Sequence, residues 1–197
     1  ALLTVGHSNH ALEHLIRLLR GQEVTTVADV RSVPWSRRHP WFQRAPLARA
    51  LEEAGIAYLF LGEALGARPR EPALRDASGR ADFARIAATG RFRAGLARVR
   101  ELAARERPAL LCAERDPADC HRTLLVCRHL RRDPALRILH LLADGRLEPH
   151  ADTERRLLRR AGLAQAELFA DDDPVERAYD RLGRRIAHVR PPDARGA

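Results

Sequence analysis

Lysine and methionine are absent from this 197-residue sequence, so arginine supplies all 35 of its basic side chains. With 26 acidic residues, the formal net charge is +9. Exclusive use of arginine together with abundant alanine is typical of GC-rich coding, which weakens any inference from charge to function. A basic surface attracts phosphates and acidic partners. Because the arginines are spread along the chain without a dense basic block, charge alone does not establish nucleic-acid binding.

Cysteine is scarce, and long apolar runs are missing. Cys112, Cys120 and Cys127 are an odd number within sixteen positions, which argues against a disulfide framework and favours reduced thiols. No apolar run approaches the roughly 18 residues that a membrane helix needs, and no basic segment followed by an apolar core opens the chain. We therefore expect a soluble, cytoplasmic protein with no membrane partner.

Five short apolar or β-branched runs alternate with helical patterns, at residues 2–5, 24–30, 56–61, 109–113 and 136–142. A β-α-β start implies a parallel sheet with right-handed crossovers. The run at 109–113 lacks polar alternation, which suits a strand covered on both faces. We predict an α/β fold over residues 1–150, with an open, mostly parallel, five-stranded Rossmann-like sheet and flanking helices.

The segments between and after these predicted strands also carry predictions. Residues 67–80 mix proline, glycine and charged side chains without period, so we expect an exposed excursion that could act as a lid. A helix is predicted from Asp119, as its N-cap, to Arg132. His140 is predicted to be a satisfied core residue. Residues 151–197 are predicted to form a helical C-terminal extension with an acidic run at 171–173 and a disordered end from Pro191.

Polar motifs follow four of the five predicted strands. In open parallel sheets, ligands bind outside the carboxyl ends of the strands, so we expect these motifs to share one pocket. The alternative is that they are caps and turns, with Ser8 or Asn9 capping the first helix. In chain order the motif residues are His7, Ser8 and Asn9; Asp29, Arg31, Ser32, Ser36 and Arg37; Gly62 and Gly66; and Glu114, Cys120, His121 and Arg122.

Three arginines are the predicted anion-binding groups of this pocket. Arg31, Arg37 and Arg122 suit bidentate contacts with phosphate or carboxylate. The alternative for each is an ion pair with Asp29 or Glu114 that braces a loop. The other predicted substrate contacts are Ser8, Asn9, Ser32, Ser36, Tyr58 and Gly62.

Glu114 is the leading catalytic candidate. Because it follows a buried strand, desolvation is expected to raise its pKa, which suits a general base, and a carboxylate there also suits a nucleophile toward a sugar C1′. A permanently ionised, arginine-paired carboxylate is the alternative. Asp29 is the second candidate carboxylate, with His7 and His121 assisting.

Cys120 is the candidate thiol nucleophile. Its place at a predicted helix start, beside His121, is a setting that lowers a thiol pKa. A buried structural thiol is nevertheless the favoured interpretation of Cys112, Cys127 and also Cys120. A metal site built from Cys112, Cys120, His121 and His7 stays open. The sequence lacks paired short ligand spacing, so we expect no metal, and the motifs call for no cofactor.

Four ordered motifs carry a resemblance to a known family. They are Thr4-Val5-Gly6-His7-Ser8-Asn9, then Asp29 to Arg37, then Tyr58 with Leu61-Gly62 and Leu65-Gly66, then Leu111-Cys112-Ala113-Glu114 through Cys120-His121-Arg122. Over residues 2–150 this set resembles the domain-of-unknown-function family 488. The resemblance implies a link to Rossmann-like nucleotide-processing enzymes and no settled reaction. Where the family pattern has a glycine after Gly66, this chain has Ala67, and the C-terminal extension lies outside the resemblance.

The motifs and the resemblance together favour an enzyme acting on a nucleotide, nucleoside or nucleic-acid component, by N-glycosidic cleavage or transfer. Its partner would be a phosphate-bearing small molecule or a nucleic acid. Two alternatives stay open: a thiol-based enzyme using Cys120, and a non-catalytic nucleic-acid-binding module.

Overall fold

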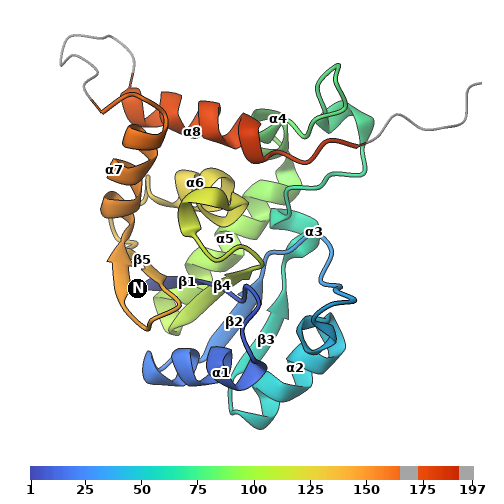
Figure 1. Ribbon diagram of the computed structural model, residues 1–197, viewed down its shortest axis with the longest axis vertical. Helices are drawn as coiled ribbons and strands as arrows, with labels where there is room; N and C mark the ends of the chain where they lie inside the picture. The colour runs from blue at the N-terminus through green and yellow to red at the C-terminus, as the bar shows by residue number, and fades with distance from the viewer. Residues whose placement is uncertain (165–172, 191–197) are drawn as a thin grey trace, which may run out of the picture.

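A single sheet organises the computed structural model, which describes residues 1–164 and 173–190. Within these residues the strand order is β3-β2-β4-β1-β5-β6 (Figure 1). The strands are β1 (Leu2–Gly6), β2 (Thr26–Asp29), β3 (Ala57–Phe60), β4 (Pro108–Cys112), β5 (Ile138–Leu141) and β6 (Leu147–Pro149). Strands β1 to β5 run parallel, and β6 pairs antiparallel with β5.

The predicted α/β class and mostly parallel sheet are confirmed, but the count of five strands is wrong. The sixth strand, β6, has three residues and lies at the sheet edge. Its sequence, Leu-Glu-Pro, is too short to show a period of two and contains a proline, which is tolerated at an edge. Sequence patterning therefore had no signal for it.

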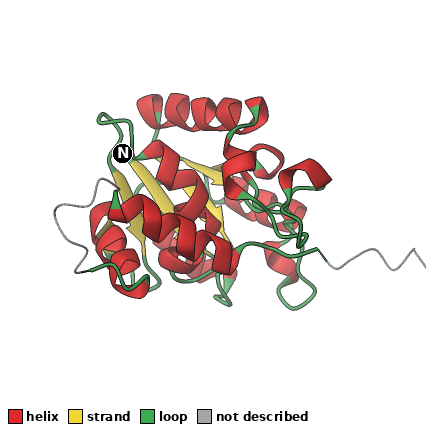
Figure 2. Cartoon of the chain, turned by 90° about the horizontal axis from the view of Figure 1, so that it is seen from above, coloured by secondary structure: helices red, strands yellow, loops and turns green. Residues whose placement is uncertain are grey.

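Helices cover both faces of the sheet (Figure 2). They are α1 (Leu12–Gly21), α2 (Arg44–Glu53), α3 (Gly62–Leu65), α4 (Phe83–Ala87), α5 (Gly90–Arg105), α6 (Arg128–Leu130), α7 (His150–Arg160) and α8 (Pro174–Ile186). Three short 3-10 turns, η1 (Pro40–Phe42), η2 (Pro72–Leu74) and η3 (Pro117–Asp119), and a π-helix, η4 (Arg122–Cys127), complete the set. None of the described helices has the length and hydropathy needed to span a membrane.

The core has a layer on each face of the sheet. Helices α1 and α2 pack on one face, against Ala109 and Leu111 of β4 among others. Helices α5 and η4 pack on the other, against Leu110 and Cys112. Successive β4 side chains thus enter opposite layers, and all of them are buried. This double burial is why the strand reads as a continuous apolar run.

The helix after β4 begins differently from the prediction. Asp116, not Asp119, is the capping residue: its carboxylate accepts the backbone N–H of Ala118 at the start of η3. The chain then passes through an extended Cys120 before η4 begins. The Asp119 carboxylate instead accepts from Arg160 of α7. The N-cap prediction failed because Asp116, next to Pro117, already starts a turn three residues earlier.

The predicted capping of α1 is also wrong. The N-cap of α1 is Ala11, which has no side-chain capping bond. Ser8 has a left-handed φ of 50° and donates its hydroxyl to the Asn9 side chain. Ser8 and Asn9 therefore shape the loop after β1, and no side chain caps the N-terminus of α1.

The C-terminal extension packs on η4. Leu124 of η4, Leu157 of α7 and Tyr179 of α8 belong to one buried cluster. The extension is predicted to be helical, and α7 and α8 agree with that. The predicted acidic run falls mostly, and the disordered end wholly, outside the described residues, and the domain boundary at residue 150 stays a prediction.

Buried polar side chains also join the extension to the sheet. Thr4 Oγ1 donates to His140 Nδ1 at 2.7 Å, and His140 Nε2 donates to His150 Nδ1 at 2.9 Å. His150 Nε2 then donates to the Tyr179 hydroxyl, which donates to Glu154, both at 2.9 Å. Burial lowers the pKa of both histidines, in agreement with this neutral chain of donors. His140 is thus a satisfied core residue, as predicted.

The excursion at residues 67–80 is mostly exposed, as predicted, but it is anchored at a few buried residues. Arg75 is buried and donates to the carbonyl oxygens of Pro69, Gly79 and His188. A β-bridge between Arg80 and Val189 adds to this contact. The excursion is therefore fastened to the segment that follows α8, and its use as a lid stays a prediction.

The approach of the loop after β4 to β1 requires a glycine at position 6. A Cβ on Gly6 would lie 1.8 Å from the Glu114 carbonyl oxygen, between two backbones that cannot easily separate. We predict that Gly6→Ala destabilises the fold by about 1–3 kcal/mol, the cost of overpacking. Urea unfolding measures this.

Gly21→Ala is the matched control. A Cβ on Gly21 would have no atom within 4 Å outside its own stretch of chain, and this glycine ends α1. The change should leave stability unaltered or raise it by up to about 1 kcal/mol. Equal stability of the two variants would contradict the close approach.

Candidate active site at the carboxyl edge of the sheet

The loops that leave β1, β2 and β4 enclose a pocket of about 640 Å³. His7 and Ser8 line it from the β1 loop. Of the predicted residues after β2, the pocket lining includes Arg31, Ser32 and Ser36; of those after β4, it includes Glu114 and His121. The parallel sheet thus brings these distant segments to one edge, where ligands bind in this class of fold.

The pocket is also lined by residues to which the sequence analysis assigned no role. Arg68 follows α3, Phe83 opens α4, and Ile186 and His188 come from the end of α8 and the segment after it. Trp35, 63% exposed, also lines the pocket. Neither Arg68 nor His188 belongs to a sequence motif. Arg68 directly follows the Gly66 turn, and this position could have indicated that it lies near the pocket. His188 lies outside the family resemblance and had no such indication.

Asp29 is the anchor of the loop after β2. It is fully buried and accepts two hydrogen bonds from the Arg31 guanidinium, at 2.9 and 2.6 Å, and one from the Tyr58 hydroxyl at 2.7 Å. Arg31 also donates to the Phe42 carbonyl oxygen at 2.8 Å. Burial and the Asp29 carboxylate raise the pKa of Tyr58, which keeps its proton. Arg31 therefore forms the ion pair with Asp29 that the sequence analysis gave as the alternative to phosphate binding. Asp29 and Tyr58 do not line the pocket themselves but hold Arg31 in position.

Gly62 serves the same loop by packing. A Cβ there would lie 2.0 Å from the Arg31 carbonyl oxygen, so the glycine allows α3 to approach the β2 loop. Nearby, Ser32 Oγ accepts the Arg68 amide and Ser36 Oγ accepts the His39 amide, both at 3.0 Å. The predicted substrate contacts Ser32 and Ser36 thus also shape their loops.

His7 is held as a neutral imidazole. Its Nδ1 donates to the Ser8 carbonyl oxygen at 2.8 Å, and its Nε2 accepts from Arg31 at 3.1 Å. The ring stacks on Phe42 with 4.2 Å between centroids. Burial, together with the Arg31 charge, lowers the pKa of His7 to about 4. An assisting role in proton transfer would therefore require Arg31 to release Nε2.

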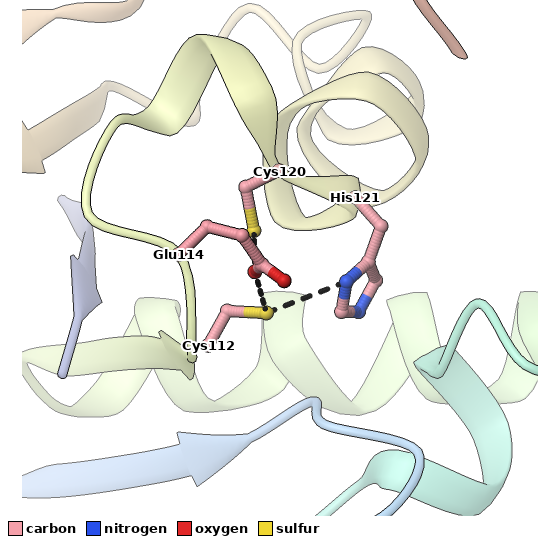
Figure 3. Close-up of side chains that lie close together, drawn as sticks. All are labelled: Cys112, Glu114, Cys120 and His121. Atoms are coloured by element: carbon pink, nitrogen blue, oxygen red, sulfur yellow. Dashed lines mark hydrogen bonds between the residues drawn. The ribbon is translucent and has the colours of Figure 1, made fainter. Parts of the chain in front are cut away.

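Glu114 lies in the centre of a compact cluster (Figure 3). Its Oε2 accepts from the Cys112 thiol and from the Cys120 thiol, both at 2.9 Å. The residue as a whole is exposed toward the pocket, while Cys112 and Cys120 are buried. The Glu114 carboxylate therefore lies between the two buried sulfur atoms and the open pocket.

His121 completes this cluster from the other side. Its Nε2 donates to the Val30 carbonyl oxygen at 3.0 Å, and its Nδ1 lies 3.4 Å from the Cys112 sulfur. One donor atom from each of Cys112, Glu114, Cys120 and His121 lies within 4.8 Å of all the others. These four residues could hold a metal ion. The metal site considered in the sequence analysis contained His7 in place of Glu114. His7 is not part of this cluster, because its Nε2 accepts a hydrogen bond from Arg31.

The electrostatics of the cluster bear on two predictions. Burial would raise the pKa of Glu114, but the two thiol donors and the His121 charge hold it at about 2, so the carboxylate is ionised and its partners are thiols. Burial raises the pKa of Cys120 well above its usual range. The favoured interpretation of Cys120 as a buried thiol agrees with the structure, and the low-pKa alternative is wrong because Cys120 is fully enclosed and donates to an anion.

Arg122 does not reach the pocket. It is fully buried, and its guanidinium donates to the carbonyl oxygens of Glu114, at 2.6 Å, and Arg115, at 3.3 Å. Arg37 and Asn9 are exposed, and neither belongs to the described lining of the pocket. Of the three predicted phosphate-binding arginines, the structure places only Arg31 at the pocket. A buried guanidinium satisfies the unpaired carbonyls of a tight loop, which a sequence does not reveal.

The fold and this edge define a doubly wound α/β protein with a candidate active site at the carboxyl ends of its central strands. Residues 11–128 match the family model described as Domain of unknown function DUF488, and the chain belongs to that family. The matched range is shorter than the predicted span of 2–150 and leaves out the motif at residues 4–9. Searches of curated proteins and of solved structures found no match.

The depressed pKa of His7 predicts a pH dependence of stability. The pKa is about 4 in the folded state and 6.5 unfolded, so between these values the unfolded chain binds more protons. Stability should therefore fall as pH drops from 6.5 to 4, by about 1.4 kcal/mol per pH unit from this group. His7→Gln, which can still accept from Arg31, should reduce that slope by this amount. Urea unfolding across the pH range measures it, and an unchanged slope would contradict the neutral, buried imidazole.

Proposed function

We propose that this protein is an enzyme acting on a nucleotide, nucleoside or nucleic-acid component, by N-glycosidic cleavage or transfer. The observation that supports this best is the composition of one pocket. An ionised carboxylate, Glu114, faces the same volume as an exposed indole, Trp35, and the arginines Arg31 and Arg68. A nucleotide offers a flat base, a sugar carbon and a phosphate, and each matches one of these groups.

Trp35 supports a base-stacking surface. A tryptophan that is 63% exposed on a pocket wall leaves apolar area facing solvent, and a nucleobase covers such area by stacking. The other tryptophan, Trp41, is 37% exposed and donates its Nε1–H to the His10 carbonyl oxygen. Its role is therefore one of loop packing.

Arg68 is the better candidate for phosphate binding. Arg31 lines the pocket, but Asp29, Phe42 and His7 take up most of its donors. Arg68 is exposed and lines the pocket, and a bidentate contact with phosphate there costs no internal ion pair. The phosphate would thus bind between α3 and the β2 loop.

Glu114 is the proposed catalytic residue. Because its pKa is about 2, it is a carboxylate at neutral pH and cannot serve as the acid. An ionised carboxylate suits attack on a sugar C1′ or stabilisation of the positive charge that develops there. The thiol donors of Cys112 and Cys120 hold one of its oxygens in place.

No specific observation favours the two alternatives. A thiol-based enzyme needs an accessible thiolate, whereas Cys120 is fully buried and its thiol pKa is raised. A nucleic-acid-binding extension would bind through exposed arginines. Arg156 and Arg160 pair with Asp116, whereas Arg159, Arg177, Arg184 and Arg185 are exposed and form no ion pair among the described residues. Exposed arginines alone do not favour a nucleic acid over another anion.

Stacking on Trp35 predicts a measurable loss of affinity. In Trp35→Leu, binding of nucleoside 5′-monophosphates should weaken by about 10–100-fold, the value of one base–aromatic stack. Trp41→Leu is the matched control and should bind as the wild type does. Calorimetric titration measures both. Equal losses in the two variants, or no binding to the wild type at millimolar nucleotide, would rule out the proposed surface.

The role of Glu114 predicts a separation of binding from turnover. Glu114→Gln should bind nucleotide with unchanged affinity and lose at least about 100-fold in the rate of base release, because the amide is neither nucleophile nor anion. The control is Asp119→Asn, since Asp119 is the other carboxylate on the pocket wall and pairs with Arg160. Chromatography of released base follows the reaction. Full activity in Glu114→Gln would exclude the carboxylate as the catalytic group.

A further inference from the structure

We infer that Cys112, Cys120, His121 and Glu114 form a site for one divalent cation of the zinc class. Cys112, Cys120 and His121 provide the buried ligands, and Glu114, which lines the pocket, provides the fourth. Figure 3 shows these four side chains close together. This inference goes beyond the proposed function and stands without it, because metal binding requires no nucleotide.

The donor set and its spacing fit a tetrahedral ion. Zinc in proteins is bound by cysteine sulfur, histidine nitrogen and carboxylate oxygen, with bonds of about 2.3 Å to sulfur and about 2.0 Å to nitrogen and oxygen. These bonds place neighbouring ligand atoms about 3.3–3.8 Å apart. The contact of the Cys112 sulfur with His121, at 3.4 Å, lies in this range, whereas the thiol hydrogen bonds of Cys112 and Cys120 to Glu114, both 2.9 Å, would lengthen on binding. All four atoms lie within 4.8 Å of one another, so small side-chain rotations admit the ion.

The orientation of His121 is the second observation. A carbonyl oxygen can only accept, so the bond to Val30 places a proton on His121 Nε2 and directs Nδ1 toward the sulfur atoms. Histidine ligands of metals characteristically donate their second ring N–H to such an acceptor, which fixes the tautomer and the ring plane. The backbone therefore holds the imidazole as a preformed ligand.

Arg122 supplies a third, independent observation. It is fully buried, its guanidinium hydrogen bonds go to backbone carbonyls, and within the described residues its Nε has no hydrogen-bond partner. A buried charge of this kind needs a counter-charge nearby. Its backbone N–H also points at the Cys120 sulfur, at 3.4 Å. In the metal-free cluster the Glu114 carboxylate supplies this counter-charge. Two thiolates, one carboxylate and a divalent cation also sum to −1, so Arg122 stays balanced when the ion binds.

The position of the cluster gives the ion access to the pocket. Cys112, Cys120 and His121 are at most 9% exposed, whereas Glu114 is exposed and lines the pocket. In catalytic zinc sites three protein ligands hold the ion and the fourth position opens to substrate or water. Here Glu114 takes that fourth position on the side of the pocket, so its displacement would open the ion to the pocket. A site closed on all four sides would instead serve structure alone.

Binding changes the protonation of the cluster in a defined way. The two thiol protons, now donated to Glu114, leave to solvent as both sulfur atoms bind the cation, and the freed Glu114 oxygen becomes the fourth ligand. The two thiol protons are therefore released per bound ion, together with the Nδ1 proton where His121 is charged, and affinity rises with pH. No oxidant or reductant takes part.

Titration of the reduced, metal-free full chain with Co²⁺, followed by displacement with Zn²⁺, tests the inference. We expect one equivalent of Co²⁺ per chain, intense sulfur-to-cobalt charge-transfer absorption, and release of at least about two protons per ion near neutral pH. Cys120→Ser should lose the charge-transfer band or weaken the affinity by at least about 100-fold, more than loss of an outer-shell partner costs.

Cys127→Ser is the matched control. Cys127 is equally buried in η4 but lies outside the cluster, so this variant should keep the stoichiometry and the absorption of the wild type. Should Cys120→Ser fail to fold, His121→Gln provides the same comparison. Binding without sulfur-to-cobalt absorption, or binding equal in wild type and Cys120→Ser, would overturn the inference. Either result would leave the nucleotide proposal standing, because the Trp35 titration does not depend on metal.

Discussion

The interaction on which this site depends is the bond between the Glu114 carboxylate and two thiols that approach it from opposite ends of one loop. Cys112 is the last residue of β4, and Cys120 directly follows η3, so the carboxylate closes the loop between them. Two features keep this loop tight. Gly6 lets the Glu114 backbone lie against β1, and the buried Arg122 satisfies the carbonyls of Glu114 and Arg115. Without both, the carboxylate would not face the pocket with its neighbours in place.

Two polar networks meet at this edge, and they differ in how completely they are satisfied. In the Asp29 network, Arg31, Tyr58 and His7 each have defined partners, so this network positions the β2 loop and one wall of the pocket. In the Glu114 network, the partners are two thiols whose hydrogen bonds to a carboxylate are weaker than coordination to a cation. The Asp29 network is therefore suited to fixing the shape of the pocket wall. The Glu114 network is suited to exchanging its thiol hydrogen bonds for coordination of a cation.

The sequence predicted the parts of the molecule that rest on patterning. The continuous apolar run of β4 indicated a strand buried on both faces, and the parallel sheet then brought the loops after β1, β2 and β4 to one edge. It did not predict where long side chains point. Arg122 stands in a motif typical of anion binding, yet its guanidinium turns into the protein to satisfy backbone carbonyls. Nor did it predict His188 on the pocket wall, because only tertiary packing brings the segment after α8 to this pocket. Arg68 was missed because no motif includes it, although it directly follows the Gly66 turn.

Anomalous diffraction at the zinc absorption edge, from crystals of the full chain grown with Zn²⁺, tests the central claim most directly. The account predicts one strong peak within about 2.3 Å of the Cys112 and Cys120 sulfur atoms and about 2.0 Å of His121 Nδ1, with Glu114 at the side of the pocket. A cluster that stays metal-free beside zinc bound elsewhere on the surface, with both thiols still at 2.9 Å from the Glu114 carboxylate, would contradict it.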